Sequence, residues 1–118
     1  MLNFKPAISI STQEWQIVSH ILNEILPSRE VWAFGSRVNK NHKPFSDLDL
    51  VVAGNQALSL IEMADLSEAF SHSNLPYRVD VVDWATTETS FKEIIESNFV
   101  VLKESTDFNP AQTQPPAP

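Results

Sequence analysis

The stretch AFGSRVNKNHKPFSDLDLVVA, residues 33–53, contains two strand-like segments separated by a polar loop. The first segment is the end of EVWAF, residues 30–34, whose valine and aromatic side chains favour a strand. Gly35 and Ser36 end that strand. The second segment is DLDLVVA, residues 47–53, which is a second strand candidate. The pattern predicts two strands of a sheet, joined by a loop that contains lysines and a proline.

A helix is predicted before the first strand. Ser11 and Glu14 form an S-x-x-E capping box, which is typical of a helix start, and Pro27 ends the segment. Between them, apolar side chains recur with a period of 3.6 residues, so that one face of the helix is buried. These side chains are Ile17, Val18, Ile21, Leu22, Ile25 and Leu26.

Four segments after the second strand alternate between helical and strand patterns. They are a helix at 56–70, the strand YRVDVVDW at 77–84, a helix that Thr86 or Thr87 caps and that carries Phe91, Ile94 and Ile95, and FVVL at 99–102, a short final strand or packing segment. The predicted fold class is therefore α/β (α+β), a small mixed β-sheet with helices packed mainly on one face.

The composition excludes several classes of protein. The chain has 118 residues, 15 acidic against 8 basic side chains, two glycines and no cysteine. Its length predicts one domain, residues 1–104, and the proline-rich composition of residues 105–118 predicts a disordered tail. The lack of cysteine rules out zinc–thiolate sites and thiol nucleophiles and fits a cytoplasmic protein, while two glycines are too few for a glycine-rich nucleotide loop. The net charge of −7 argues against direct nucleic-acid binding, and no apolar run is long enough for a membrane span.

Asp47 and Asp49 are the first candidates for chemistry. Strand alternation places both on one face, with Leu48 and Leu50 in the core, and keeps the two carboxylates within about 7 Å of each other. Such a pair repels itself unless a cation lies beside it, and carboxylate oxygens suit Mg²⁺. The alternative is a solvent-facing edge strand whose charges discourage pairing with other strands. This alternative is weakened because aspartate is disfavoured within strands.

Asp80 is the candidate for a third carboxylate. It lies in the apolar strand at 77–84 and shares a face with Arg78 by alternation. If this strand neighbours the one at 47–53, three carboxylates meet, and three carboxylates can hold two divalent ions about 4 Å apart for an in-line phosphoryl transfer. Asp83 is the rival candidate, but its place near the end of the strand favours solvent or a turn cap.

Gly35 and Ser36 form a possible anion site. Glycine permits a tight turn, and the serine offers a hydroxyl and an N–H group. The alternative is an ordinary strand-to-helix turn in which Ser36 is the N-cap residue. Arg37, Lys40 and Lys43 follow closely in an otherwise acidic chain and suggest that a triphosphate binds here, although polar loops often carry lysine.

The motifs in combination resemble the nucleotidyltransferase superfamily. Gly35 and Ser36, ten intervening residues, Asp47-x-Asp49, and Asp80 on a later strand match the G-S-x10-D-x-D pattern with its separate third aspartate. AFGSR…SDLDLVV followed by VDVVDW is similar to the minimal nucleotidyltransferases (MNT) of bacteria and archaea, over roughly residues 11–103. Those proteins are often antitoxins encoded beside a HEPN-domain toxin.

This resemblance implies a nucleotidyltransferase fold and a role for each motif. Gly35 and Ser36 would bind the triphosphate of ATP, and Arg37 would add a phosphate contact. The three aspartates would ligate two Mg²⁺ ions, and Asp80 would also help to deprotonate the attacking hydroxyl. The implied reaction transfers a nucleoside monophosphate, AMP from ATP, to a tyrosine hydroxyl of the HEPN toxin, which would form a hetero-oligomer with this chain.

Other functions stay open from the sequence alone. An antitoxin could neutralise its partner by binding alone, without catalysis, although a pure binder has no use for three mutually repelling acids. A transferase acting on a small molecule is a third hypothesis, which the short chain disfavours because larger family members add a helical domain. A polymerase fits least, given the charge and size. The acidic chain suits a basic partner.

Overall fold

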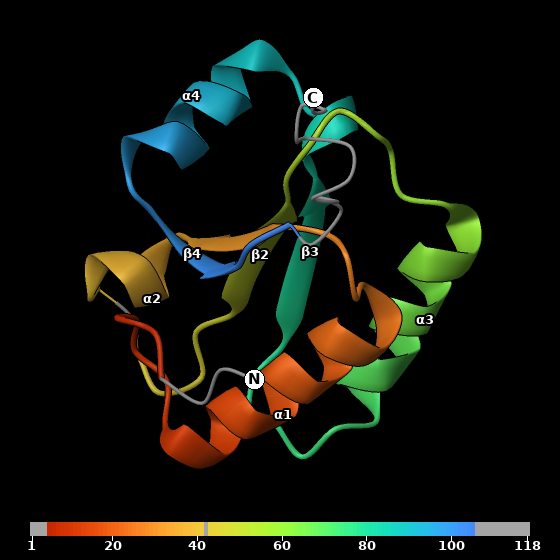
Figure 1. Ribbon diagram of the computed structural model, residues 1–118. Helices are drawn as coiled ribbons and strands as arrows, with labels where there is room; N and C mark the ends of the chain where they lie inside the picture. The colour runs from red at the N-terminus through yellow and green to blue at the C-terminus, as the bar shows by residue number, and fades with distance from the viewer. Residues whose placement is uncertain (1–4, 42, 106–118) are drawn as a thin grey trace, which may run out of the picture.

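The two strands around the Gly-Ser turn form the centre of a four-stranded sheet (Figure 1). A computed structural model describes residues 5–41 and 43–105. Its elements are α1 (Thr12–Ile25), β1 (Val31–Phe34), α2 (Ser36–Asn39), β2 (Leu48–Val52), α3 (Leu60–Ser71), β3 (Val79–Asp83), the 3₁₀ turn η1 (Trp84–Thr86), α4 (Thr89–Ser97) and β4 (Phe99–Lys103). The strand order is β3-β2-β1-β4, with β2 and β3 parallel and the other two pairs antiparallel. The sheet is mixed, as predicted.

One face of the sheet packs against α1 and α3, which lie side by side (Figure 1). Leu48 and Leu50 of β2 are fully buried there, as strand alternation predicts. They share this core with Val18 and Leu22 of α1 and with Leu66 of α3. Because the odd and even positions of β2 face opposite ways, burying its leucines directs Asp49 to the other face.

The opposite face carries a smaller core beneath α4. Ile95 of α4 is fully buried against Phe34 and Val51, and Trp32 and Trp84 pack around them. The prediction of helices mainly on one face is confirmed, and α4 is the helix that covers part of the second face. This helix matters for function, because Asp49 and Val51 are two residues apart on β2 and so point to this same second face.

The predicted start of the first helix is confirmed, and two later starts are corrected. Ser11 and Glu14 form both hydrogen bonds of the capping box. The helix predicted from residue 56 begins only at Leu60, where Ser59 caps it through a second capping box with Glu62. That S-x-x-E signal was present in the sequence. The longest helix has 14 residues, and none within the described ranges has the length and apolar character needed to cross a bilayer.

Neither Thr86 nor Thr87 caps the last helix. Glu88 occupies the N-cap position of α4, while the hydroxyls of both threonines donate to the backbone oxygen of Asp83. The reason is that Asp83 starts the 3₁₀ turn η1 by accepting a hydrogen bond from Ala85 N–H, and the threonines complete that turn. Asp83 thus caps a turn, as the strand-end argument predicted.

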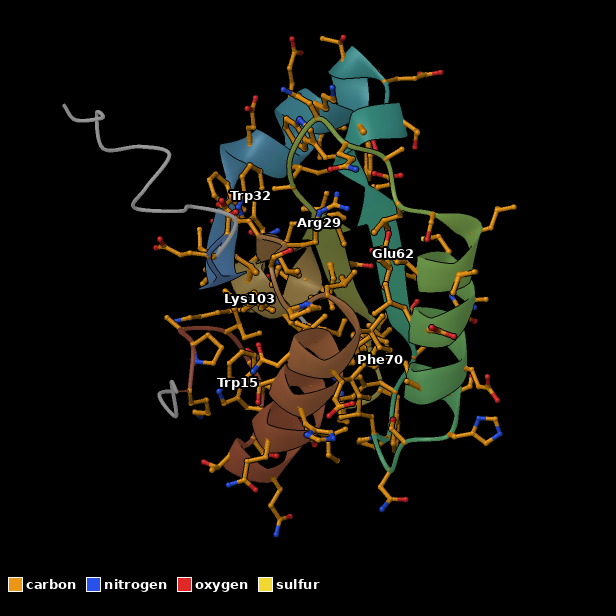
Figure 2. All side chains as sticks on the ribbon, turned by 45° about the vertical axis from the view of Figure 1, so that its right-hand side comes forward. Trp15, Arg29, Trp32, Glu62, Phe70 and Lys103 are labelled. Atoms are coloured by element: carbon orange, nitrogen blue, oxygen red, sulfur yellow. The ribbon has the colours of Figure 1, made fainter. Side chains whose placement is uncertain are left out.

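The end of α1 is joined to the last strand, β4. Pro27 comes directly after the end of α1 and its C-cap residue, Leu26. The last carbonyl groups of a helix have no hydrogen-bond partner within it, so they need partners from elsewhere. The ammonium group of Lys103 donates to the backbone oxygens of Leu26, Pro27 and Arg29, at 2.9, 3.2 and 2.8 Å (Figure 2). The tail predicted from residue 105 lies outside the described residues except for Ser105, so its disorder stays a prediction.

Candidate active site

The parallel pairing of β2 and β3 brings the predicted carboxylates together. In its register Asp49 lies directly opposite Asp80. The two strands meet at their starts, where Leu48 N–H donates to the backbone oxygen of Arg78 at 2.9 Å. Asp47 and Arg78 each precede the first residue of their strand, so their side chains are neighbours too. Residues about thirty positions apart in the chain thus form one cluster, because the helix α3 provides the crossover that a parallel pair requires.

Gly35 lies against the carboxylate of Asp49. It has a φ of 83°, a conformation that glycine adopts more readily than other residues, and it is the N-cap residue of α2. A Cβ atom at this position would overlap Oδ2 of Asp49. Ser36 is the first residue of α2 rather than its N-cap, so the alternative in which Ser36 caps the turn does not apply. The close approach explains why the strand ends in glycine.

We expect Gly35→Ala to disturb the site as well as the backbone. Gly35 has φ 83° and ψ −156°, a region essentially restricted to glycine, so holding alanine there costs about 1 kcal/mol or more, and the added methyl group must also displace the Asp49 carboxylate. The total loss of stability should be about 2 kcal/mol, and activity should fall at least about tenfold because a carboxylate of the candidate site is moved. Denaturation in urea and a transfer assay measure the two effects.

Gly54→Ala is the matched control. Gly54 has a φ of 108°, but a Cβ atom there would meet nothing within 4 Å. This variant should lose about 1 kcal/mol and keep its activity. Equal effects of the two substitutions on activity would contradict the close approach of Gly35 to Asp49.

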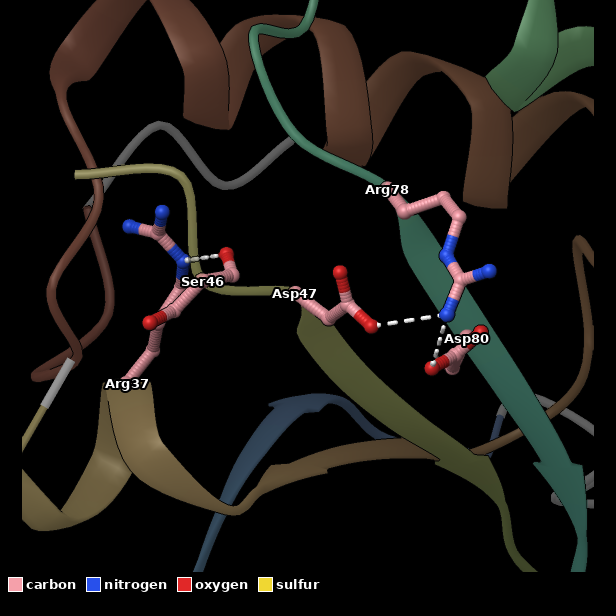
Figure 3. Close-up of polar contacts among 5 residues, drawn as sticks. All are labelled: Arg37, Ser46, Asp47, Arg78 and Asp80. Atoms are coloured by element: carbon pink, nitrogen blue, oxygen red, sulfur yellow. Dashed lines mark hydrogen bonds and ion pairs between the residues drawn. The ribbon is translucent and has the colours of Figure 1, made fainter. Parts of the chain in front are cut away.

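Arg78 connects two of the three carboxylates. Its Nη2 atom lies 3.0 Å from Oδ2 of Asp47 and 3.6 Å from Oδ2 of Asp80 (Figure 3). The guanidinium side chain is 74% exposed, and those of Asp47 and Asp80 are 36% and 47% exposed. Alternation had placed Arg78 on the face of Asp80, but the sequence does not show that it bridges to another strand.

The charge of the cluster shifts the pKa of Asp49. Burial of this side chain, followed by repulsion from Asp80 and Asp47, raises its pKa from 3.8 to about 6, while the positive charge of Arg78 acts in the opposite direction. The hydrogen bond from Arg78 to Asp47 raises the pKa of the guanidinium group still further above its usual value. Positive charge is therefore favourable at this point of the surface, and one guanidinium does not neutralise all three acids.

Arg37 does not point toward the carboxylates, which differs from the role expected for it. It is 4% exposed, and its guanidinium donates to the backbone oxygen of Ser46 at 3.0 Å (Figure 3). It also donates to the backbone oxygens of Ser9 and Pro44, at 2.8 and 3.0 Å. The same group lies 3.8 Å from the ring centroid of Tyr77. Arg37 thus holds the segment that leads into Asp47 and is not placed as the predicted phosphate contact. The lysines of the loop, Lys40 and Lys43, are exposed.

The donor groups suit a hard divalent cation, although they are not arranged around one. Within residues 5–41 and 43–105, no three acidic or histidine side chains form a group ready to hold an ion. A guanidinium cation bridges Asp47 and Asp80 instead, and it contacts the oxygen atoms that a metal ion would use. Carboxylate oxygens are the ligands that Mg²⁺ prefers. The residues therefore fit Mg²⁺ provided that Arg78 moves away.

The order of strands, the Gly-Ser turn and the three neighbouring carboxylates, two of them on strands, together define a nucleotidyltransferase. Residues 16–107 match the family described as polymerase beta, nucleotidyltransferase, and the chain belongs to this family. The chain is 46% identical over 97 residues to a protein named probable protein adenylyltransferase MntA from Haemophilus influenzae, covering 82% of this chain and 85% of that protein. The resemblance seen in the sequence is confirmed at the level of the family.

Solved structures share the fold at lower identity. One is a toxin–antitoxin complex with AMP-PNP, at a TM-score of 0.65 and 21% identity, covering 79% of this chain and 75% of that one. Another is a tri-AMPylated Shewanella oneidensis HEPN toxin in complex with an MNT antitoxin, at a TM-score of 0.58 and 21% identity, covering 79% and 71% of the two chains. At these identities the likeness establishes the fold and no more.

Proposed function

We propose that this nucleotidyltransferase is an antitoxin that transfers AMP from ATP to a hydroxyl group, that of a tyrosine, on a HEPN-domain toxin. The observation that carries the proposal is the register that sets Asp49 opposite Asp80, with Gly35 packed against Asp49. The relative named as a probable protein adenylyltransferase supports the choice of reaction. The tri-AMPylated HEPN toxin in a related complex supports the choice of acceptor.

The proposal assigns a task to each group of the site. Gly35 and Ser36 would bind the triphosphate at the turn after β1, and Asp47, Asp49 and Asp80 would hold two Mg²⁺ ions. When bound, the ions neutralise charge on the phosphates and lower the barrier to in-line displacement. The acceptor hydroxyl forms a bond to the α-phosphorus of ATP, the bond to the β-phosphate oxygen breaks, and pyrophosphate leaves. The Asp80 carboxylate accepts the proton of the hydroxyl.

The partner is part of the proposal. The net charge of −7 suits a toxin with a basic surface, and opposite charges accelerate association. Both proteins would act in the cytoplasm. We expect the partner to complete the acceptor side of the site, as a related antitoxin forms a complex with an AMPylated HEPN toxin.

A second candidate is neutralisation by binding alone. The observation that favours it is the ion pair of Arg78 with Asp47 and Asp80, because a cation fixed within the protein could make a metal unnecessary. The first proposal is preferred because Asp49 lies beside this ion pair, and burial followed by repulsion from Asp80 and Asp47 raises its pKa, so a further positive charge is favourable at the cluster.

Intact mass spectrometry distinguishes the two candidates. The product of the neighbouring gene, the candidate for the HEPN-domain toxin, is incubated with this protein, ATP and Mg²⁺, and both proteins are weighed. We expect a gain of one or more AMP units on the toxin, and no gain with the double variant Asp47→Asn/Asp49→Asn. Asp65→Asn, on the exposed surface of α3, is the matched control and should transfer AMP normally. No mass gain, with a stable complex and full neutralisation, would support binding alone.

A further inference from the structure

Phosphate groups are bound well by arginine side chains, but Arg37 cannot contact a nucleotide without leaving its present partners. Its guanidinium is bonded to three backbone oxygens and stacked on Tyr77. Arg78 is the arginine that reaches the carboxylates, and 74% of its side chain is exposed. Its position raises the question of what it does when the site is occupied.

We propose that Arg78 is a phosphate-binding residue of this site, held by Asp47 and Asp80 while the site is empty and released to the nucleotide when a divalent cation takes its place. This inference rests on the proposed nucleotidyl transfer and adds a residue that the sequence motifs do not include. The guanidinium contacts Oδ2 of Asp47 and Oδ2 of Asp80, which are oxygens that the cation requires (Figure 3). The cation and Arg78 therefore compete for the same atoms.

The released side chain stays beside the site. Arg78 precedes β3 and lies two residues before Asp80 on the same strand face. The backbone of Arg78 is tied to β2 by the hydrogen bond from Leu48 N–H. Its Cα atom therefore cannot move far, and only the long, exposed side chain has to turn. A planar guanidinium can bond two phosphate oxygens at once, so a bound triphosphate would replace the two carboxylates as its partner.

Arg78 should have opposite effects on the affinity for a cation alone and on the affinity for the nucleotide. Without nucleotide, Arg78 weakens cation binding, because its guanidinium already contacts the carboxylates and its positive charge repels the incoming cation. With nucleotide, Arg78 strengthens binding because it contacts the phosphates. Removing the charge should therefore improve the affinity for a cation alone and reduce the affinity for the nucleotide. A residue with a merely structural role would not separate the two affinities in this way.

The test uses Arg78→Gln and Arg78→Lys in the full chain. Mn²⁺ alone is titrated and followed by electron paramagnetic resonance, and AMP-PNP with Mg²⁺ is titrated by calorimetry. We expect Arg78→Gln to bind Mn²⁺ about three- to tenfold more tightly than wild type and AMP-PNP about tenfold more weakly, as for the loss of one charged hydrogen bond. Arg78→Lys should lie between the two proteins in both titrations, because it keeps the charge and loses the planar fork. Lys92→Gln makes the same change of charge on α4, where Lys92 lies over Trp84, and should leave both affinities unchanged.

Two sets of results would overturn the inference. Arg78→Gln that binds Mn²⁺ no more tightly than wild type would show that the side chain does not compete with the cation. Unchanged AMP-PNP affinity would show that it does not contact the phosphates. A wild-type protein that binds Mn²⁺ but no AMP-PNP would instead contradict nucleotidyl transfer itself. Circular dichroism of each variant verifies folding, and Arg78→Lys still tests the inference if the glutamine variant unfolds.

Discussion

Asp49→Asn is expected to stabilise the metal-free protein at neutral pH and to abolish nucleotidyl transfer. The folded protein raises the pKa of Asp49 from 3.8 to about 6, so the folded state binds a proton more tightly than the unfolded state. The free energy of unfolding contributed by this carboxyl therefore falls as the pH rises from about 4 to about 6, and it stays low above that range. Asparagine carries no charge, so the free energy of unfolding of the variant does not fall in this way.

The size of the stabilisation follows from the same shift. The carboxyl is only partly buried, and screening by solvent reduces the full effect to about 1 kcal/mol. Urea denaturation of wild type and Asp49→Asn at pH 8 and at pH 4 measures it: the variant should be the more stable protein at pH 8, and the difference should vanish at pH 4. If the advantage of Asp49→Asn in free energy of unfolding grew toward low pH, the folded protein would not disfavour the charged form of Asp49.

The same substitution should cost catalysis at least about 100-fold, because a charged metal ligand supplies several kcal/mol of stabilisation to the transition state. Mg²⁺ should raise the melting temperature of the wild type and leave that of the variant unchanged. Asp83→Asn is the control for removing an acid from the same region. It should lose stability at pH 8, because the Asp83 carboxylate accepts hydrogen bonds from Leu58 and Ala85 N–H, and it should keep its activity. If Asp49→Asn were more stable than the wild type and still fully active, Asp49 would not take part in catalysis.

Strand periodicity explains why the carboxylates could be placed from the sequence. Buried Leu48 and Leu50 leave no choice for the direction of Asp49, since successive side chains of a strand face opposite ways. The side chains of β3 alternate in the same manner, so Asp80, which pairs with Asp49, faces the same side of the sheet. What periodicity cannot supply is the register between strands, and this register decides that Arg78 reaches Asp47.

Arg37 could not be placed for a related reason. The sequence shows an arginine directly after a Gly-Ser turn, where a phosphate contact is a reasonable prediction. Its actual partners include Ser9 and Tyr77, which are far from it in the chain and meet it only after folding. Local sequence does not indicate burial of a charged side chain by backbone oxygens from distant segments. The start of α3 is a different case, because the sequence contains the capping box of Ser59 but its apolar pattern begins earlier, at Leu58.

Arg37→Met is expected to destabilise the fold by about 3 kcal/mol. It removes three charged hydrogen bonds to backbone oxygens, each of which contributes about 1.5 kcal/mol or more, and part of this loss is recovered when water reaches the freed oxygens. Arg37→Lys should lose about 2 kcal/mol, because a single ammonium group cannot reach three acceptors that a guanidinium fork spans. Arg29→Met is the matched control. Arg29 donates to the backbone oxygen of Gln56, and its loss should cost under about 1 kcal/mol.

The consequence for the site follows from where the lost bonds lie. Two of the three acceptors, Pro44 and Ser46, belong to the segment that enters β2, and Asp47 comes directly after them. Freeing this segment should misplace the Asp47 carboxylate and reduce transfer at least about tenfold even in protein that is still folded. Urea denaturation, transfer rates at a temperature where both proteins are folded, and AMP-PNP affinity separate these effects. Unchanged stability together with a large loss of AMP-PNP affinity would make Arg37 the phosphate contact after all, and its bonds to Pro44 and Ser46 would then have to open when the nucleotide binds.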